Sequence, residues 1–395
     1  MSVSANSLSF LSVRRGELSQ AAARRTSRLC RHDWILTGSA LALSVYGAVL
    51  VWSATRARTS LTGGDPEFFL KRHLLNLAIG VVLMAGTSVL SYAWLRACAP
   101  VFYVLAVGGL LAVLTPLGTT INGAHSWIVL GGGFSIQPAE YMKVAVVLGL
   151  AVVLAAGVTN RRLVGALAVA GLPIAVIMLL PDLGSAMVVV AAAAGMLIFA
   201  GLSRGRLAAL TASIVLAAVA ATKFHLLAQH QVNRFAAFAD PHLDPQGVGY
   251  NTNQARLAIG SGGFLGEGLF HGTQTNGRYV PEQQTDFVFT VVGEELGFVG
   301  CLVLIALFGV LLLRGVHLAR EAEGLFGMLV CAGVVSWFAF QTFENIGMTL
   351  GIMPVAGIPL PFVSYGGSSM FANFIAVGLM QNVHLRATRS AGSPA

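Results

Sequence analysis

The sequence predicts an all-α fold, a polytopic membrane protein of about ten transmembrane helices. Three observations predict it: 56% of the residues are hydrophobic, only 10% are charged, and apolar runs recur along most of the chain. Soluble domains carry about 25% charged residues, whereas a run of about 20 apolar residues is long enough to cross a bilayer. The alternation typical of a transmembrane barrel is not seen.

Ten apolar windows of about 20 residues give the expected spans in chain order. They are 35–53, 74–91, 97–115, 139–156, 163–180, 184–201, 207–224, 287–313, 324–343 and 366–384. The seventh and eighth spans are separated by residues 225–285, and a loop of that length is too long to be a simple connection. We therefore expect a large extracytoplasmic loop that caps one face of the bundle.

The distribution of lysine and arginine predicts the orientation. With the N-terminus inside the cell, 15 of the 24 lysines and arginines fall in cytoplasmic segments, so the positive-inside rule places both termini in the cytoplasm. We expect residues 1–33 to form a disordered cytoplasmic tail without a removable signal peptide, 34–385 the membrane domain, and 386–395 a second cytoplasmic tail. The net charge of +8 fits this topology and anionic lipid headgroups, and it indicates no nucleic-acid partner.

The most informative stretch is PEQQTDFVFTVVGEELG, which begins at Pro281 and places Thr285 and Asp286 at the mouth of the eighth span. A carboxylate at the edge of a membrane is costly and therefore suggests a functional site, although a helix cap is the alternative from local sequence. At 100° per residue, Glu294 is offset from Asp286 by about 80° and Glu295 by about 180°. All three cannot face one cavity, and we expect Glu295 to be structural.

A second outer segment ends in QPAEYMK, from Gln137 to Lys143. Pro138 suits the first turn of a helix, and Glu140 and Lys143 lie three residues apart on one helix face, where they can pair. The pair either joins neighbouring helices or presents an ammonium group to the phosphate oxygens of a lipid headgroup. We expect Glu294 to be the partner of Lys143 across helices.

The remaining candidates lie in two outer segments and in the long loop. Asp182, in the tight turn PDLGS, is a natural cap for the helix that follows. The long loop contributes the cations Arg234 and Arg256. Ser364 lies in the segment 345–369, whose three prolines forbid a continuous helix. Broken backbone at membrane depth is tolerated where it lines a cavity, and a rigid corner without substrate contact is the alternative.

The four cysteines and nine histidines are scattered along the chain. None of them has the spacing of a known metal motif or of a disulfide framework. We therefore expect no dedicated metal site built from these residue types.

Five ordered motifs together resemble one family. They are NGAHSWIVLGGGFSIQPAEYMK, PDLGSAM, NRFAAFADP with GYNTNQARLAIGSGGFLGEGL, PEQQTDFVFTVVGEELG, and NIGMTLGIMPVAGIPLPFVSYGGSS. In this order they are similar to the signatures of the SEDS family (shape, elongation, division and sporulation), over about residues 33–384. One departure is Gln284, since many members have histidine there, which puts a proton relay through that side chain in doubt.

The resemblance implies a ten-helix peptidoglycan glycosyltransferase that polymerises lipid II on the outer face of the bacterial plasma membrane. The family's essential acid maps onto Asp286. Forming a β-1,4 link from an α-linked diphosphate donor requires inversion, so one carboxylate can take the proton of the acceptor hydroxyl while undecaprenyl diphosphate leaves. We assign the other candidates as follows: substrate contacts to Gln137, Glu140, Lys143, Arg234, Arg256 and Ser364, and support to Asp182, Pro281, Thr285 and Glu294.

The resemblance is closest to the elongation branch, RodA, of a high-GC Gram-positive bacterium, with the division branch, FtsW, as the alternative. It also implies Mg²⁺ or Mn²⁺ as cofactor. The implied partners are lipid II, the nascent glycan, a class B penicillin-binding protein and other membrane proteins of the elongation complex. Two other classes compete: a lipid II flippase, disfavoured because the polar positions cluster at the outer side, and a non-catalytic scaffold, disfavoured by the retained Asp286.

Overall fold

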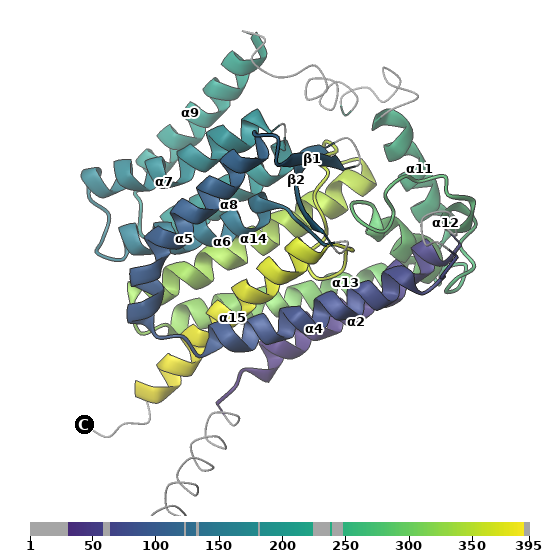
Figure 1. Cartoon of the computed structure of the whole chain (residues 1–395), viewed down its shortest axis with the longest axis horizontal. Helices are drawn as coiled ribbons and strands as arrows, with labels where there is room; N and C mark the ends of the chain where they lie inside the picture. Colours follow the sequence, from purple (N-terminus) through teal and green to yellow (C-terminus); the bar gives the residue numbers. More distant parts are fainter. Residues whose placement is uncertain are drawn as a thin grey trace, which may run out of the picture.

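A helix lies at each of the ten positions where the sequence analysis expects a span, as the computed structural model shows (Figure 1). These helices are α2 (Trp34–Arg56), α4 (Phe68–Ser88), α5 (Tyr92–Val113), α6 (Pro138–Leu154), α7 (Asn160–Leu179), α8 (Leu183–Phe199), α9 (Arg204–Lys223), α13 (Val288–Glu321), α14 (Leu325–Leu350) and α15 (Gly367–Ser390). The structure describes residues 31–57, 64–121, 124–131, 134–180, 182–223, 238 and 248–390.

The expected tails and the long loop are only partly covered by the described residues. Residues 1–30 and most of 224–247 lie outside them. Two helices, α11 (Val248–Ser261) and α12 (Thr273–Gly277), form in the rest of the long loop, and α15 continues beyond the expected boundary at residue 385.

Within the part of the chain that the structure describes, six helices are long and apolar enough to cross a membrane: α2, α4, α5, α7, α13 and α14. The fold is therefore that of a polytopic helical membrane protein. α6 and α14 lie inside the bundle, with α7 and α9 to one side and α2, α4 and α15 to the other (Figure 1). Of the 17 residues of α6, 13 are buried, because this helix packs against α5, α7, α8, α14 and α15.

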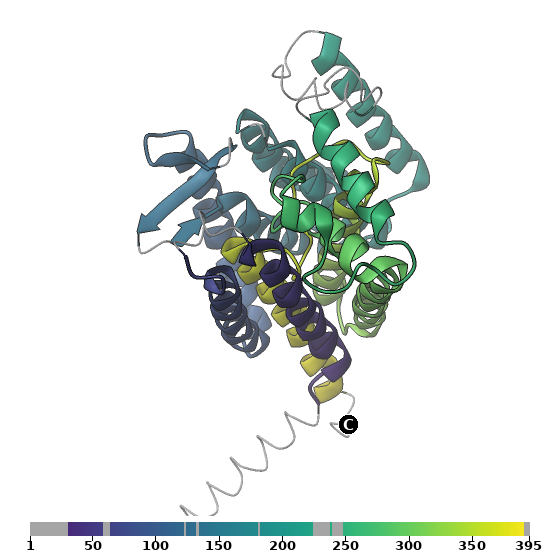
Figure 2. The same ribbon diagram turned by 90° about the vertical axis from the view of Figure 1, so that its right-hand side faces the viewer.

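A small antiparallel sheet interrupts the helical fold and corrects the all-α prediction. Its strands are β1 (Gly118–Ile121), β2 (Ala124–Gly131) and β3 (Phe134–Ile136), in the order β1-β2-β3. Sequence analysis placed this stretch in the outer segment between the third and fourth spans and assigned it no strands. Pairing the strands satisfies backbone groups that a helix would otherwise have bonded internally, and the sheet lies at the side of the bundle (Figure 2).

One end of the bundle collects the polar segments, and we call it the site end. α6, α8, α13 and α15 begin there, and α14 ends there. The predicted break in the proline-rich segment is confirmed, since α14 stops at Leu350 and α15 starts at Gly367.

The long loop is packed against the first turns of α13. Gly297 kinks this helix with φ of 63°, a backbone conformation that glycine adopts readily. A β-carbon added to Gly262 would lie 2.0 Å from the carbonyl oxygen of Gly293. Glycine at these positions therefore lets the loop and the helix meet backbone to backbone.

Candidate active site

Asp286 lies at the predicted place, two residues before α13 begins at Val288. The preceding turn is built on Glu282, whose carbonyl oxygen accepts the N–H groups of residues 285, 286 and 287 at 3.1, 3.1 and 3.2 Å. Glu282 itself has φ of 49°, which is uncommon for a residue other than glycine. The turn presents Asp286, half-buried, at the start of the helix.

The turn is held through three of its own consecutive carbonyl groups, which accept hydrogen bonds from other parts of the chain. The oxygen of residue 284 accepts the backbone N–H of Tyr365 at 2.8 Å, the oxygen of Thr285 accepts the hydroxyl of Ser364, and the oxygen of Asp286 accepts the amide of Asn345 at 2.8 Å. All three donors come from the end of α14 and the proline-rich segment. The backbone around Asp286 is therefore held by residues that come later in the sequence.

Asn345 joins three parts of the site. It is fully buried, and its amide nitrogen also donates to the carbonyl oxygen of Ile358 at 2.8 Å. The same side chain thus ties α14 to Asp286 and to the proline-rich segment. Sequence analysis did not single out Asn345, although a buried amide at the start of the NIGMTLG motif was a usable signal.

Arg72 is a second residue that sequence analysis missed. Its side chain hydrogen-bonds the phenol of Tyr365, and its guanidinium lies 4.7 Å from the ring centroid of Phe68. Burial raises the pKa of the Tyr365 phenol, and Arg72 opposes that rise. A half-buried cation is therefore placed beside the residue whose N–H holds the turn of Asp286.

Lys143 pairs with Glu140, as the helical spacing predicted. The Nζ atom lies 2.7 Å from Oε1 of Glu140, and both side chains are only 1% exposed. Nζ also donates to Oε1 of Gln341 at 3.0 Å and lies 5.0 Å from the ring centroid of Trp337. In this conformation the ammonium group is enclosed by protein contacts.

These contacts continue from Lys143 to the proline-rich segment. Gln341 donates through Nε2 to the carbonyl oxygen of Pro359 at 2.7 Å, and the next N–H, of Leu360, donates to the hydroxyl oxygen of Ser364 at 2.8 Å. Ser364 in turn bonds Thr285. A series of hydrogen bonds, together with the peptide bond between Pro359 and Leu360, therefore connects the buried Lys143–Glu140 pair to Thr285.

The expected pairing of Glu294 with Lys143 is wrong. Glu294 is buried, and its carboxylate accepts the N–H groups of Gln274 at 2.5 Å and Thr275 at 3.0 Å, together with the Thr275 hydroxyl at 2.6 Å. These donors lie in α12, because the long loop folds back over α13. Glu295 is structural, as expected, and accepts the hydroxyl of Ser53 at 2.6 Å.

Asp182 and Gln137 connect the starts of three helices. Asp182 caps α8 by accepting the N–H of Ser185 at 3.0 Å, which confirms the predicted cap. The side chain of Gln137 donates to Asp182 at 3.4 Å, and its backbone N–H donates to Ser368 of α15 at 3.0 Å. The contacts of Gln137 thus join α6, α8 and α15, and its contact with substrate stays a prediction.

The long loop carries the two predicted cations, Arg256 and Arg234. Arg256 is exposed on α11, and its Nε donates to the carbonyl oxygen of Leu350 at 3.1 Å, the last residue of α14. Arg234 lies outside the described residues. Pro281 is exposed at the start of the turn, and the hydroxyl of Thr285 contacts the carboxylate of Glu282 at 3.2 Å.

The acidic, histidine and cysteine side chains do not gather into a metal site among the described residues. Within the described ranges, no three histidine, cysteine, aspartate or glutamate side chains converge closely enough to hold an ion. The described side chains therefore do not form a complete metal site of this kind.

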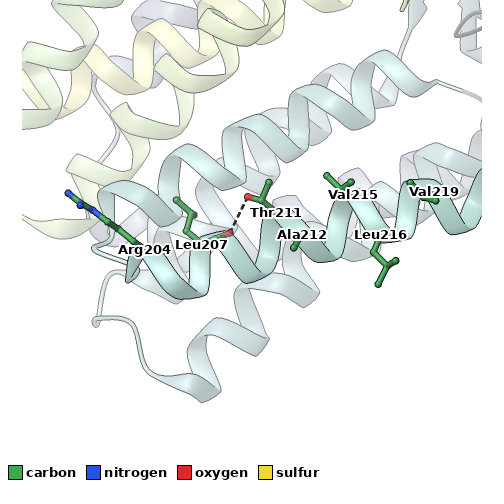
Figure 3. A pocket seen from close by; sticks show the side chains of 8 residues that line it. Arg204, Leu207, Thr211, Ala212, Val215, Leu216 and Val219 are labelled. Carbon is green, nitrogen blue, oxygen red and sulfur yellow. Dashed lines mark hydrogen bonds between the residues drawn. The ribbon is translucent and has the colours of Figure 1, made fainter.

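A shallow, open space of about 790 Å³ lies elsewhere, along one side of α9 (Figure 3). Its lining comes from that helix alone, between Arg204 and Val219, and is apolar apart from Arg204 and Thr211. None of the candidate site residues lines it, so it is separate from the site of Asp286.

The fold and the site together define a class: a polytopic helical membrane protein with an acidic residue held at one end of the bundle. The profile of the family FtsW/RodA/SpoVE, described as cell cycle protein, matches residues 33–389. The chain belongs to this family, which is the one that its five motifs resemble.

Relatives with assigned names support this membership. A probable peptidoglycan glycosyltransferase FtsW of Trichlorobacter lovleyi is 33% identical over 91% of this chain and 95% of its own length. Stage V sporulation protein E of Bacillus subtilis is 36% identical over 91% and 98%. Peptidoglycan glycosyltransferase MrdB of Escherichia coli K12 is 35% identical over 87% and 91%.

Solved structures share the fold. One chain, from work on the structural coordination of polymerization and crosslinking by a peptidoglycan synthase complex, matches with a TM-score of 0.74 and 32% identity, over 90% of this chain and 98% of that one. The rod shape determining protein RodA of Thermus thermophilus matches with a TM-score of 0.66 and 30% identity, over 92% and 98%.

Proposed function

We propose that this protein is a peptidoglycan glycosyltransferase that polymerises lipid II into β-1,4-linked glycan strands. The observation that carries the proposal is the half-buried Asp286 in a chain of this family. Hydrogen bonds to the backbone carbonyl groups of residues 284, 285 and 286 hold it in place. Relatives that match most of the chain are named peptidoglycan glycosyltransferases. A fixed carboxylate suits a reaction that depends on the position of one base.

Asp286 acts in this proposal as the general base. Its carboxylate takes the proton of the acceptor sugar hydroxyl while that oxygen attacks the anomeric carbon of the donor. The bond from that carbon to the diphosphate breaks on the opposite face, so the configuration inverts and no covalent enzyme intermediate forms. Base assistance of this kind contributes on the order of 10² to 10⁴ in rate.

The leaving diphosphate requires positive charge. Arg72, half-buried beside Tyr365, is the described cation that we favour, because a guanidinium can bind phosphate oxygens through two N–H groups. Arg256 and Arg234 remain part of the proposal as cations of the long loop. We also retain Mg²⁺ or Mn²⁺ as a partner of the diphosphate itself, whose oxygens are ligands that Mg²⁺ prefers.

The finer assignments belong to the proposal as well. We infer ten transmembrane spans, both termini in the cytoplasm, and the site end outside the plasma membrane. The role is cell elongation, as in RodA of a high-GC Gram-positive bacterium, with FtsW-like division as the alternative. The partners are a class B penicillin-binding protein and other membrane proteins of the elongation complex. The relatives include FtsW, MrdB and a sporulation protein, so the shared chemistry is better supported than the branch.

The function is tested with purified protein and labelled lipid II, with and without the cognate class B transpeptidase. We expect glycan polymer on a gel, and more of it when the partner is present. Movement of lipid II across vesicles without polymer would support a flippase, and neither product in the presence of the partner would support a scaffold.

Asn345 supplies the next prediction. Asn345→Ala is expected to lower the turnover rate of polymerisation by on the order of 10², with little change in the lipid II concentration for half-maximal rate, because a carboxylate displaced by about 1 Å loses catalytic alignment. Initial rates measured over a range of lipid II concentrations separate the two quantities.

Asn382→Ala is the matched control. Asn382 is also a buried asparagine that donates to backbone carbonyls, those of Thr87, Ser88 and Leu90, but it lies far from the site end along α15. Both variants are expected to lose some thermal stability, since buried carbonyls lose their donors. Equal losses of turnover in the two variants would show that Asn345 acts only through stability.

A further inference from the structure

The small sheet has one apolar end. Leu117, Val129, Leu130 and Phe134 are 65%, 51%, 63% and 45% exposed. The strand register brings them together, because Gly118 pairs with Ile128 and Gly131 pairs with Phe134. The opposite end of the sheet is polar, with Thr120 against His125 at 3.1 Å.

The sheet is fixed to the bundle at other points. A ring nitrogen of His125 contacts the carbonyl oxygen of Val113 at the end of α5, at 3.0 Å. On the other side, Ser368 of α15 donates to the carbonyl oxygen of Ser135 at 3.3 Å. The C-terminal end of β2 points away from the helices (Figure 2), and these hydrogen bonds hold the sheet in that orientation.

The apolar end continues the surface of a membrane helix. α5 is one of the six helices apolar enough to cross a bilayer, and Val104, Leu105, Leu111 and Leu114 of its surface are 67%, 67%, 47% and 45% exposed. Leu117 follows directly after this surface. Exposed apolar side chains on a membrane helix are in contact with lipid, and a contiguous apolar patch marks an interaction site.

Charge distinguishes lipid from a protein partner. Residues 97–139 contain no aspartate, glutamate, lysine or arginine, so the apolar end has no charged residue of its own segment to form the polar rim that surrounds a protein interface. Strand β2 instead carries Trp127, and tryptophan is enriched where a protein meets the membrane surface.

We propose that the apolar end of the sheet inserts into the bilayer surface at the site end, where its exposed side chains contact lipid. The depth is limited to the boundary between headgroups and acyl chains, because the edge strands β1 and β3 have backbone groups that the hydrocarbon core would leave unbonded. The polar end, at Thr120 and His125, stays in water.

The test places a fluorescent probe at each end of the sheet. Leu130→Cys and Thr120→Cys are labelled with an NBD maleimide in the full chain, and each is placed in nanodiscs of phosphatidylglycerol and phosphatidylethanolamine, where both faces are open to solvent. Protein that carries only its own four cysteines gives the background. Polymerisation from lipid II confirms that each labelled variant is folded.

We expect the probe at position 130 to be quenched by a lipid with a nitroxide near the top of its acyl chain, and to be reduced several-fold more slowly by dithionite than the probe at position 120. Equal reduction rates at the two positions would overturn the proposal. It would also be overturned if position 130 became protected only after the class B transpeptidase was added, because the surface would then bind protein.

Discussion

Asp286→Asn is expected to reduce polymerisation of purified lipid II by on the order of 10² to 10⁴, to the background of a gel assay, because the amide cannot accept the proton of the acceptor hydroxyl. The shape of the side chain is kept, and the backbone contacts of residues 284 to 286 do not use it. Thermal stability in detergent should therefore stay close to that of the unmodified protein.

Asp65→Asn is the matched control for this change. Asp65 is an exposed carboxylate whose partner is Lys71, at 3.0 Å, and exposed ion pairs contribute little to stability. We expect its polymerisation rate to be unchanged. Normal polymer from the Asp286→Asn protein would remove the general base from the proposed mechanism while leaving the family membership intact.

Lys143→Met is expected to have the largest effect on stability, a loss of about 3–5 kcal/mol, because it leaves the buried carboxylate of Glu140 without its positive partner. The contact of Lys143 with Gln341, which itself donates to Pro359, is lost at the same time. Thermal unfolding in detergent measures the loss, and polymerisation should fall with it.

The double variant Glu140→Gln/Lys143→Met separates two roles of Lys143. Removing both charges avoids an unpaired buried charge and should restore much of the stability. If Lys143 acts by holding Gln341 and the proline-rich segment, polymerisation should recover in part with the fold. A stable double variant without activity would show that the ammonium group itself contacts substrate, as sequence analysis expected.

Arg72→Gln gives a useful comparison in the same assay. Arg72 is half-buried beside Tyr365, and glutamine keeps a polar side chain there, so we expect a smaller loss of stability than for Lys143→Met. A higher lipid II concentration for half-maximal rate, with a smaller change in turnover, is the result that fits a diphosphate contact.

The helical bundle was predictable because hydropathy and helix geometry act locally. Each expected span coincides with a helix, Pro138 starts α6, Asp182 caps α8, and Glu140 reaches Lys143 within one helix. These features depend on neighbours three or four residues apart, which a sequence displays directly.

The predictions that were wrong or missing all involve contacts between segments that are distant in the sequence. Glu294 was assigned to Lys143 by its angle on α13, yet the long loop returns α12 to the same carboxylate. The sheet was missed because pairing between strands is set by register and not by composition. The roles of Asn345 and Arg72 depend on the contact of α14 with Asp286 and of α4 with Tyr365, and the sequence does not display which distant segments meet.

The contacts that hold the turn of Asp286 can form only late in the synthesis of the protein. These three backbone contacts come from residues 345, 364 and 365, all of which leave the ribosome after Asp286 itself, since synthesis proceeds from the N-terminus. A nascent chain that has already inserted α13 but ends before these residues thus lacks the three donors that hold the turn of Asp286. If Asp286 is the general base, as proposed, we expect such an incomplete polypeptide to be inactive on lipid II.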